Sequence, residues 1–194
     1  HSRKAQRRCV LETASLDKGG LERVVANMAI DLRAHGWRPS IVVTERDGQI
    51  GQQCRVAGIP VHFIKRDPGA LKAVLENEKA DLLVVHYSNL GPCVAWRLGI
   101  PVVSVVHNSY IWSDAAFDQE VRRADLYIKS YVAVSTGVKR YFCRKYGVSL
   151  DKVLVIPNGI NISDYEKALA ERPIITRATL GLAPDDVVLL NVAS

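Results

Sequence analysis

Residues 9–34 of the 194-residue chain read CVLETASLDKGGLERVVANMAIDLRA. The first five of these residues are apolar enough for a buried strand, and residues 16–22 interrupt the apolar run. From Leu21 onward, apolar residues recur at the spacing of a helix with one buried face. The sequence therefore predicts a strand, a turn and a helix, with Gly19 and Gly20 between the strand end and the helix start.

The glycine pair is a candidate ligand-binding turn. Two glycines let the backbone adopt positive φ and approach a ligand without a Cβ in the way. The first free N–H groups of the helix point to the same place, where the helix dipole favours an anion. We predict that Gly19 and Gly20 form one wall of a phosphate- or sugar-binding cleft, although a tight turn without a ligand explains the pattern equally well.

Further apolar runs continue the alternation of strand and helix along the chain. The expected strands are 40–44, 61–64, 81–86, 101–106, two short pieces at 126–128 and 131–134, and 153–156. The expected helices are 50–57, 68–79, 91–98, 113–124 with Ser113 or Asp114 as N-cap, and a helix capped by Ser135 that ends at Tyr146. Continuous apolar strands of this kind are typical of a parallel sheet with helices on both faces. The predicted fold class is α/β, a Rossmann-like doubly wound parallel sheet.

Three polar turns follow predicted strands. They are Gly19-Gly20, His107-Asn108 and Asn158-Gly159. Ligands of open α/β sheets bind beyond the carboxyl ends of the strands, so we expect the three turns to meet along one edge. Each turn can also be purely structural. His86, which ends another strand, is a candidate to line the acceptor pocket, but a structural role is expected for it.

The C-terminal part of the sequence has a different pattern. Residues 161–171 are predicted to be a linker with a short helix, 174–180 a further helix and 187–192 a buried-type strand. We predict an N-terminal domain at residues 9–160. Residues 161–194 are then the linker helix and first strand of a truncated second domain.

Composition and missing motifs narrow the chemistry. The chain is 48% hydrophobic and 24% charged, with a net charge of +6, so it can bury a large core and tolerate anionic partners. The positive charge forms no block, and nucleic acid is therefore not indicated. The sequence contains no GxGxxG, P-loop or GxSxG motif, no Asp-x-Asp pair and no histidines at metal-ligand spacing. We expect neither a metal nor a tightly bound cofactor, and chemistry on a phosphate-bearing ligand.

Cysteine usage and hydropathy bear on the compartment. The four cysteines, Cys9, Cys54, Cys93 and Cys143, are well separated and form no CxxC pair. This usage is typical of reduced, buried thiols in a cytoplasmic protein. No apolar run reaches transmembrane length.

Four segments together resemble glycosyltransferase family 4, whose members have the GT-B fold. They are residues 16–24 (LDKGGLERV), 99–103 (GIPVV) leading to His107, 131–135 (YVAVS) and 152–160 (KVLVIPNGI). Each segment is a loose match alone, but four in the family's order are fairly specific. The resemblance covers about residues 11–194.

The resemblance implies two Rossmann-like domains facing across a cleft, with this chain mainly on the acceptor side. Gly19 and Gly20 would approach the diphosphate of a nucleotide-diphosphate sugar, and His107 would contact the transferred sugar as the catalytic candidate. Ser135 would face the cleft, and Asn158 and Gly159 would shape the interdomain turn. The family's paired glutamates and basic diphosphate-binding residues belong to the C-terminal domain, so none is assigned here.

The function implied by the resemblance is retaining, metal-independent transfer of a hexose to a glycan or lipid-linked acceptor. Such an enzyme would serve polysaccharide or cell-envelope assembly, and we expect this fragment alone to be inactive. The alternatives are a sugar-nucleotide epimerase of the same architecture and a non-catalytic domain that binds a sugar or lipid. Basic and aromatic residues at 139–146 allow a peripheral membrane contact, but they fit an ordinary amphipathic helix better.

Overall fold

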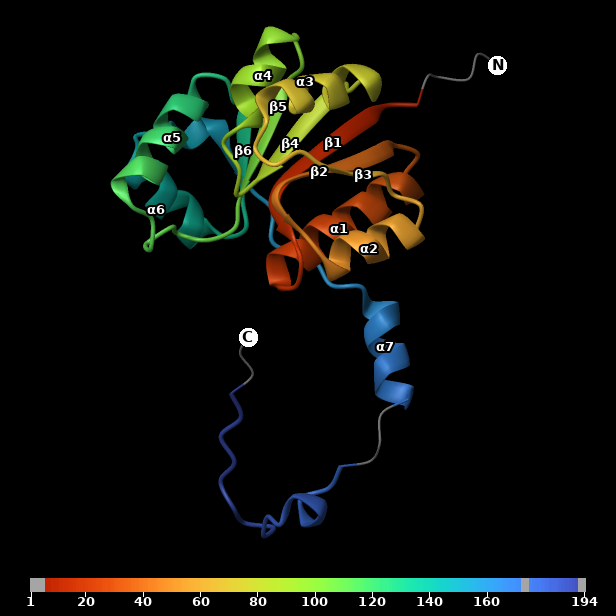
Figure 1. Ribbon diagram of the computed structural model, residues 1–194. Coiled ribbons are helices and arrows are strands. Elements are labelled where there is room, and N and C mark those ends of the chain that lie inside the picture. Colours follow the sequence, from red (N-terminus) through yellow and green to blue (C-terminus); the bar gives the residue numbers. More distant parts are fainter. Residues whose placement is uncertain (1–5, 172–174, 192–194) are drawn as a thin grey trace. The chain divides into compact units, whose positions relative to one another are not determined.

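Seven parallel strands form one sheet in the computed structural model, which describes residues 6–171 and 175–191. The strand order is β3-β2-β1-β4-β5-β6-β7 (Figure 1). The strands are β1 (Arg8–Leu16), β2 (Arg38–Asp47), β3 (Val61–Phe63), β4 (Leu82–His86), β5 (Val102–Val106), β6 (Ser130–Ala133) and β7 (Val153–Val155). The predicted Rossmann-like parallel sheet is confirmed.

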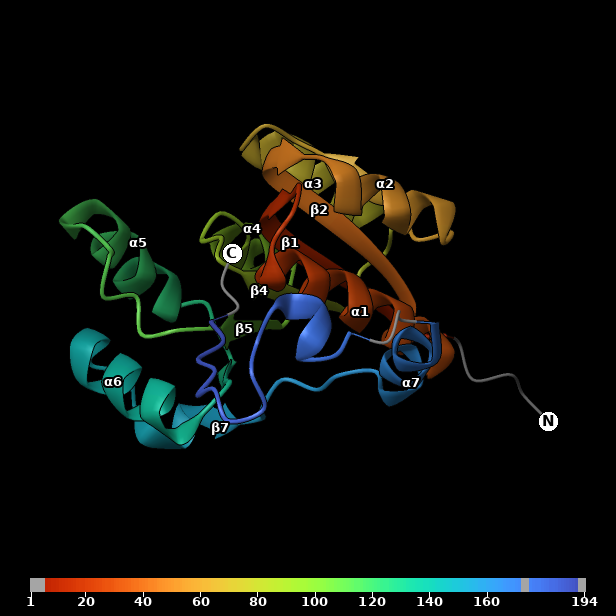
Figure 2. The same ribbon diagram turned by 90° about the horizontal axis from the view of Figure 1, so that it is seen from below.

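Helices cover both faces of this sheet. They are α1 (Gly20–Ala34), α2 (Gln49–Val56), α3 (Pro68–Asn77), α4 (Gly91–Arg97), α5 (Ala115–Asp125) and α6 (Thr136–Tyr146), and a 3₁₀ turn, η1 (Leu150–Lys152), precedes β7. Helices α1 and α2 pack on one face and α3 to α6 on the other. Helices α5 and α6 lie together at the β6–β7 end of the sheet in two perpendicular views (Figure 1 and Figure 2).

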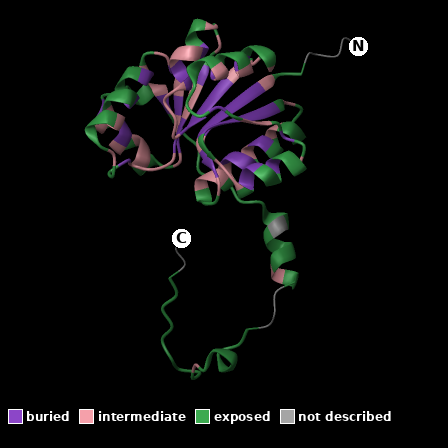
Figure 3. Cartoon of the chain, viewed as in Figure 1, coloured by how far each residue is buried: buried purple, intermediate pink, exposed green. Residues whose placement is uncertain are grey.

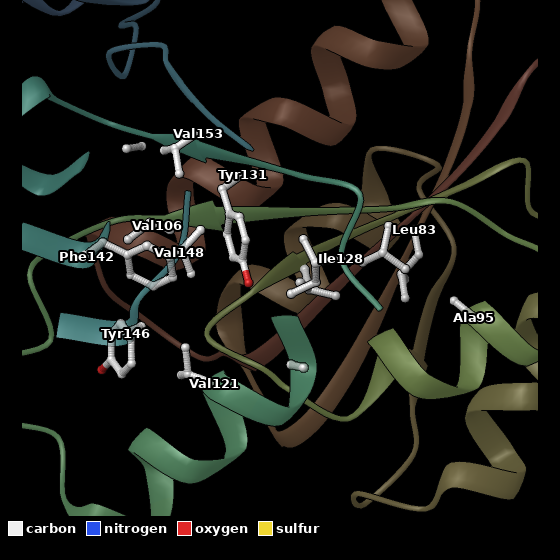
Figure 4. Close-up of a cluster of buried hydrophobic side chains, with 14 of the residues drawn as sticks. Leu83, Ala95, Val106, Val121, Ile128, Tyr131, Phe142, Tyr146, Val148 and Val153 are labelled. Carbon is white, nitrogen blue, oxygen red and sulfur yellow. The ribbon is translucent and has the colours of Figure 1, made fainter. Parts of the chain in front are cut away.

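Two apolar cores lie between the sheet and its helices, one on each face of the sheet. The strands are largely buried, whereas the outer faces of the helices are exposed (Figure 3). Strand β4 serves both cores, because Leu83 and Val85 point to the α3–α6 side and Val84 to the α1–α2 side. On the α3–α6 side, Phe142 packs against Tyr131 with ring centroids 5.0 Å apart (Figure 4). Continuous apolar strands are thus explained by burial on both faces.

Side-chain caps fix where several helices begin. Asp114 accepts a hydrogen bond from the N–H of Phe117 over 2.8 Å, and Ser135 accepts one from the N–H of Val138 over 3.1 Å. These bonds satisfy backbone donors that a helix start leaves unpaired. The N-cap expected at residue 113 or 114 is therefore Asp114, and the cap expected at Ser135 is confirmed.

Several predicted boundaries were wrong. Strand β2 spans Arg38–Asp47 rather than 40–44. Strand β1 continues three residues past Thr13, through a register shift against β2 between Thr13 and Ser15. Residues 126–128 are not a strand piece. Instead the N–H of Tyr127 bonds to the carbonyl of Ala124 over 2.9 Å, so these residues form a turn that ends α5.

The chain divides into two compact units, residues 1–157 and 158–194. In the second unit, helix α7 (Ile162–Glu171) forms as expected from the linker prediction. The helix expected at 174–180 is reduced to a 3₁₀ turn, η2 (Ala178–Leu180), which begins where Thr176 and Thr179 bond to each other; Ile174 lies outside the described residues.

The strand expected at 187–192 is absent from residues 187–191, and Val192 lies outside the described residues. Val187 and Leu189 are 90% and 94% exposed. An apolar run becomes a strand only where a neighbouring strand completes its hydrogen bonds, and these residues pair with none.

All four cysteines are free, and Cys9, Cys54 and Cys143 are buried. Within residues 6–171 and 175–191, no helix is long and apolar enough to cross a membrane.

Candidate functional site

Strand β4 lies between β1 and β5, and the carboxyl ends of all three reach the same edge of the sheet. Thr13 of β1 is paired with His86 of β4, and His86 with Val105 of β5. The loops that leave these strands therefore begin side by side. The structure places the Gly19-Gly20 turn and His107 beyond this one edge, with the β4–α4 loop between them.

The start of α1 differs in one respect from the prediction. Gly19 has φ +147°, which L residues rarely adopt, whereas Gly20 is the first helical residue and has no positive φ. A Cβ on Gly20 would meet nothing within 4 Å. The backbone conformation requires a glycine only at position 19. At position 20 the missing side chain leaves open space at the helix N-terminus.

The carboxylate of Glu22 occupies part of that N-terminus. A Cβ on Gly19 would collide with Oε2 of Glu22 and would lie 3.3 Å from its Cδ. A carboxylate in the first turn is favoured by the helix dipole. An incoming phosphate would compete with Glu22 for the same partial positive charge.

His86 and His107 form a hydrogen-bonded pair at the centre of the edge. Nδ1 of His86 lies 2.9 Å from Nε2 of His107. His86 is fully buried, and His107 is partly exposed. Burial lowers the pKa of His86 from 6.5 to about 3, helped by the charge that His107 would carry, and burial lowers the pKa of His107 to about 4. Both imidazoles are therefore neutral near pH 7.

Tyr87 and Asn108 fix the other side of the His107 ring. The Tyr87 ring stacks on the His107 ring with an interplanar angle of 15° and centroids 5.8 Å apart. The side-chain amide of Asn108 donates to the Tyr87 hydroxyl, and its Oδ1 accepts from the N–H of Tyr110 over 2.7 Å. Tyr87 itself has φ +52°, an uncommon conformation for a bulky residue. Residues of two successive strand ends thus hold His107 in one orientation.

Aromatic residues continue outward from this pair. Trp112 lies 6.0 Å from Tyr87 and 5.9 Å from Tyr110, measured between ring centroids, and is 59% exposed. Ile111 beside it is 73% exposed. The β5–α5 loop therefore presents an apolar tip next to the histidine pair.

An ion-pair cluster anchors the base of that loop. Nζ of Lys145 lies 3.2 Å from Oδ1 of Asp118 and donates to Ser113 Oγ over 2.6 Å and to the Tyr110 carbonyl over 2.8 Å. The Ser113 hydroxyl, followed by Tyr146 and Lys145, holds the pKa of Asp118 below its usual range. The cluster ties the loop to both α5 and α6.

Glu12 is a buried carboxyl in the middle of β1. Its Oε1 accepts from the Ser88 hydroxyl and, over 3.1 Å, from the N–H of Gly91 at the start of α4. Burial raises the pKa of Glu12 from 4.5 to about 7, although Ser88, Gly91 and Arg66 oppose the rise. Through Ser88, Glu12 holds the loop that carries Tyr87.

The remaining predicted site residues are Ser135, Asn158 and Gly159. Ser135 is at the carboxyl end of β6, and its hydroxyl is already used as the α6 cap. Asn158 and Gly159 belong to the second compact unit, residues 158–194. A ligand role for each of these residues stays a prediction.

The basic helix α6 is an amphipathic core helix, as expected. Phe142 and Tyr146 are buried, and Arg140 and Arg144 are exposed. Two lysines of this helix, Lys139 and Lys145, are bonded to acceptors within the protein. Lys139 donates to the Val153 carbonyl over 2.6 Å, and Lys145 belongs to the cluster with Asp118.

Sequence reasoning missed Glu12, Tyr87 and Trp112 and assigned His86 a structural role. Glu12 was detectable as the acidic residue inside a largely apolar run, Cys9–Thr13. Tyr87 follows His86 at the end of β4, and Asn108 follows His107 just after the end of β5. The same pattern of a histidine and a polar residue after a strand could have identified Tyr87. The pairing of the two histidines had no sequence signal, because it depends on β4 and β5 being neighbours.

A groove of about 530 Å³ lies at the opposite edge of the sheet, lined among others by Trp96, Pro101, Leu126 and Lys129. Pro101 and Lys129 precede β5 and β6, so this groove is separate from the His107 edge. Among the described residues, no three His, Cys, Asp or Glu side chains are grouped as metal ligands would be.

The parallel sheet, the glycine turn at a helix start and the polar strand ends define a Rossmann-like α/β domain. The chain belongs to Glycosyltransferase Family 4, whose family model matches residues 18–164. No curated protein sequence gives a significant match.

Solved structures share this fold. HepE of Anabaena in complex with UDP superposes with a TM-score of 0.71 at 17% identity, over 90% of this chain and 50% of HepE. A glycosyltransferase of Rickettsia africae matches with a TM-score of 0.66 at 18% identity, over 84% of this chain and 46% of the other. UDP-N-acetylglucosamine 2-epimerase of Rickettsia bellii matches with a TM-score of 0.62 at 14% identity, over 92% of this chain and 52% of the epimerase. The chain therefore spans about half the length of the structures that it matches.

Proposed function

We propose that this chain is the N-terminal, acceptor-side half of a glycosyltransferase. The enzyme would move a hexose from a nucleotide-diphosphate sugar to a glycan or lipid-linked acceptor, with retention of configuration and without a metal. The observation that carries the proposal is the family match over residues 18–164, the segment that includes both the glycine turn and His107. HepE, which was crystallised with UDP and glucose, supports a nucleotide-sugar donor.

The reaction sets what the site must provide. Breaking the bond to the anomeric carbon passes through an oxocarbenium-like state, and the leaving group is a diphosphate. Such a leaving group needs fixed hydrogen-bond donors more than it needs a protein nucleophile. The N-terminus of α1, opened by Gly19 and Gly20, supplies backbone donors of this kind. His107 would contact the transferred sugar near the reacting carbon.

The donor nucleotide would be held mainly by a second domain, because the matched structures are about twice as long as this chain. Ser135, Asn158 and Gly159 would then line or shape the interdomain cleft. The residues 1–194 alone should bind nucleotide weakly and show no transfer. Robust transfer by this chain alone would contradict the two-domain proposal.

A second candidate activity is epimerisation of a sugar nucleotide. The likeness to UDP-N-acetylglucosamine 2-epimerases favours it, since those enzymes share the fold at similar TM-scores. The two activities are separated by their products. A transferase releases nucleotide diphosphate only when an acceptor is present, whereas an epimerase converts the sugar nucleotide without any acceptor.

The test is a panel of sugar nucleotides presented to the longer protein that contains this chain. Release of nucleotide diphosphate is measured with and without candidate glycan and polyprenyl-phosphate acceptors. Acceptor-dependent release supports the proposal. Acceptor-independent change of the sugar supports the epimerase, and nucleotide binding without either reaction indicates a non-catalytic binding domain.

We further propose a role in polysaccharide or cell-envelope assembly at the cytoplasmic face of a membrane. Acinetobacter baumannii MurG shares the fold with a TM-score of 0.58 at 15% identity, over 80% of this chain and 46% of MurG. The exposed Arg140 and Arg144 on α6 and the net charge of +6 fit an anionic surface. Flotation with anionic and neutral vesicles tests this, because only anionic vesicles should retain the protein.

A further inference from the structure

The contact between His86 and His107 determines which ring nitrogen of His107 is available to a substrate. Two neutral imidazoles 2.9 Å apart share one proton, so one nitrogen donates and the other accepts. If His86 Nδ1 donates, His107 holds its own proton on Nδ1. If His107 Nε2 donates, Nδ1 of His107 is a bare acceptor.

Burial of His86 decides between these arrangements. Its second nitrogen, Nε2, is buried and has no hydrogen-bond partner in the part of the chain that the structure describes. When His107 donates, this Nε2 must carry a proton that has no acceptor. When His86 donates, Nε2 is only an unused lone pair. A buried N–H without an acceptor is the rarer and costlier situation.

We infer that His86 is a positioning residue that donates from Nδ1 to Nε2 of His107 and thereby holds His107 as the Nδ1–H tautomer. The inference rests on the proposed function for its catalytic meaning, but not for its geometry. His107 then offers a hydrogen-bond donor at Nδ1, while its only lone pair on the ring nitrogens is already used by His86.

The assignment defines what His107 does in sugar transfer. A donor at Nδ1 can bind an oxygen of the sugar or of the departing phosphate. It cannot remove a proton from the acceptor hydroxyl, because no ring nitrogen is free to accept it. The Tyr87 ring stacked on His107 keeps the imidazole plane fixed, so the donor points in one direction.

The direct test is the protonation of the ring nitrogens in this 194-residue chain. Long-range proton–nitrogen correlation spectra of ¹⁵N-histidine-labelled protein at pH 7.5 distinguish protonated from bare nitrogens. We expect protonated Nδ1 and bare Nε2 at both His86 and His107. A protonated Nε2 at His107 would overturn the inference, and this result needs no variant to fold.

Two variants then test whether His86 sets the tautomer. His86→Leu removes the donor and should release His107 into a mixture of tautomers, while His86→Asn keeps an N–H near the place of Nδ1 and should preserve the Nδ1–H form. His62→Gln is the matched control, because His62 bonds to Glu78 on the surface and lies outside the candidate site. An unchanged His107 spectrum in folded His86→Leu would assign the tautomer to another cause and overturn the inference.

The activity measurement uses the longer protein that contains this chain. His86→Leu should lower kcat by about 3- to 10-fold, in proportion to the fraction of His107 that leaves the Nδ1–H tautomer, with little change in KM for the donor. His86→Asn should stay within about twofold of the wild type, since it keeps that tautomer. If the longer protein transfers no sugar, the proposed function fails while the tautomer result still stands. If transfer proceeds and His86→Leu keeps the wild-type kcat, the positioning role fails alone.

Discussion

The N–H of Gly91 donates to Oε1 of Glu12 over 3.1 Å, and this bond joins the first turn of α4 to the centre of β1. A Cβ on Gly91 would collide with Oε2 of Glu12 and would lie 2.6 Å from Cδ2 of Leu83. The two residues therefore fit only as a pair. Their contact holds Ser88 and the loop that carries Tyr87 against His107.

Gly91→Ala should destabilise the fold by about 1–3 kcal/mol, because the added methyl overpacks a closed site. Gly137→Ala is the matched control. The nearest atom to a Cβ there is Ser135 Oγ at 3.8 Å, and Ala is the better helix former, so its stability should be equal or higher. Urea unfolding followed by circular dichroism measures both. Equal midpoints for the two variants would contradict this packing.

The pH dependence of stability should have two opposed parts. The pKa values of His86 (about 3) and His107 (about 4) lie below the ordinary 6.5, so unfolding takes up protons below pH 6.5 and stability is lost as the pH falls. The pKa of Glu12, about 7 against 4.5, acts in reverse: unfolding releases its proton between pH 4.5 and 7. The net uptake between pH 4.5 and 6.5 is about one proton.

Glu12→Gln removes the opposing part and keeps an acceptor for Gly91. Its stability should therefore fall about twice as steeply as that of the wild type between pH 6.5 and 5, which corresponds to about 1.4 kcal/mol more per pH unit. Urea unfolding at four pH values gives the slope. Parallel slopes for the two proteins would show that Glu12 has an ordinary pKa.

Glu22→Gln should strengthen binding of a nucleotide diphosphate. The Glu22 carboxylate lies at the N-terminus of α1, where it competes with a phosphate for the helix dipole, and its removal should lower the Kd about 2- to 5-fold. Isothermal titration with UDP measures the effect. Glu76→Gln on α3, which removes only an exposed carboxylate, should leave the Kd unchanged. An unchanged Kd in Glu22→Gln would place the nucleotide away from α1 and contradict the prediction.

Lys145→Met should cost about 1–2 kcal/mol, because it removes hydrogen bonds from a charged donor to Asp118, Ser113 and the Tyr110 carbonyl. Lys72→Met breaks an exposed pair with Glu76, 3.7 Å apart, and should change stability by less than about 0.5 kcal/mol. Trp112 fluorescence should also shift in Lys145→Met alone, since Lys145 anchors that loop. Identical unfolding curves for the two variants would refute the anchoring role.

Much of the fold was predictable because buried parallel strands are continuous apolar runs. Val102–Val106 and Leu82–His86 needed no tertiary information to be recognised as strands. The run at 187–191 has the same composition and is exposed, because a strand also requires a neighbour, which no local pattern supplies. The strand predicted at residues 126–128 was wrong for a similar reason, since these residues form the turn that follows the end of α5 at Asp125.

The site was predictable only as positions along the chain. Gly19, Gly20 and His107 were identifiable as polar turns after strands, and the sheet order places these turns at one edge. The partners of His107 were not identifiable, since His86 meets it only through the adjacency of β4 and β5. Glu12 is hydrogen-bonded to Gly91, which is 79 residues away in the sequence. A local pattern of apolar residues does not predict a contact between such distant residues.

His107→Ala in the longer protein, compared with His62→Ala, tests the central claim most directly. Nucleotide diphosphate release is measured in the presence of acceptor, and thermal unfolding confirms that both variants are folded. We predict a loss of about 10²-fold in kcat for His107→Ala, in line with removal of one positioned donor, and wild-type release for His62→Ala. Wild-type release by a folded His107→Ala would contradict the account, because the sugar would then react away from this edge of the sheet.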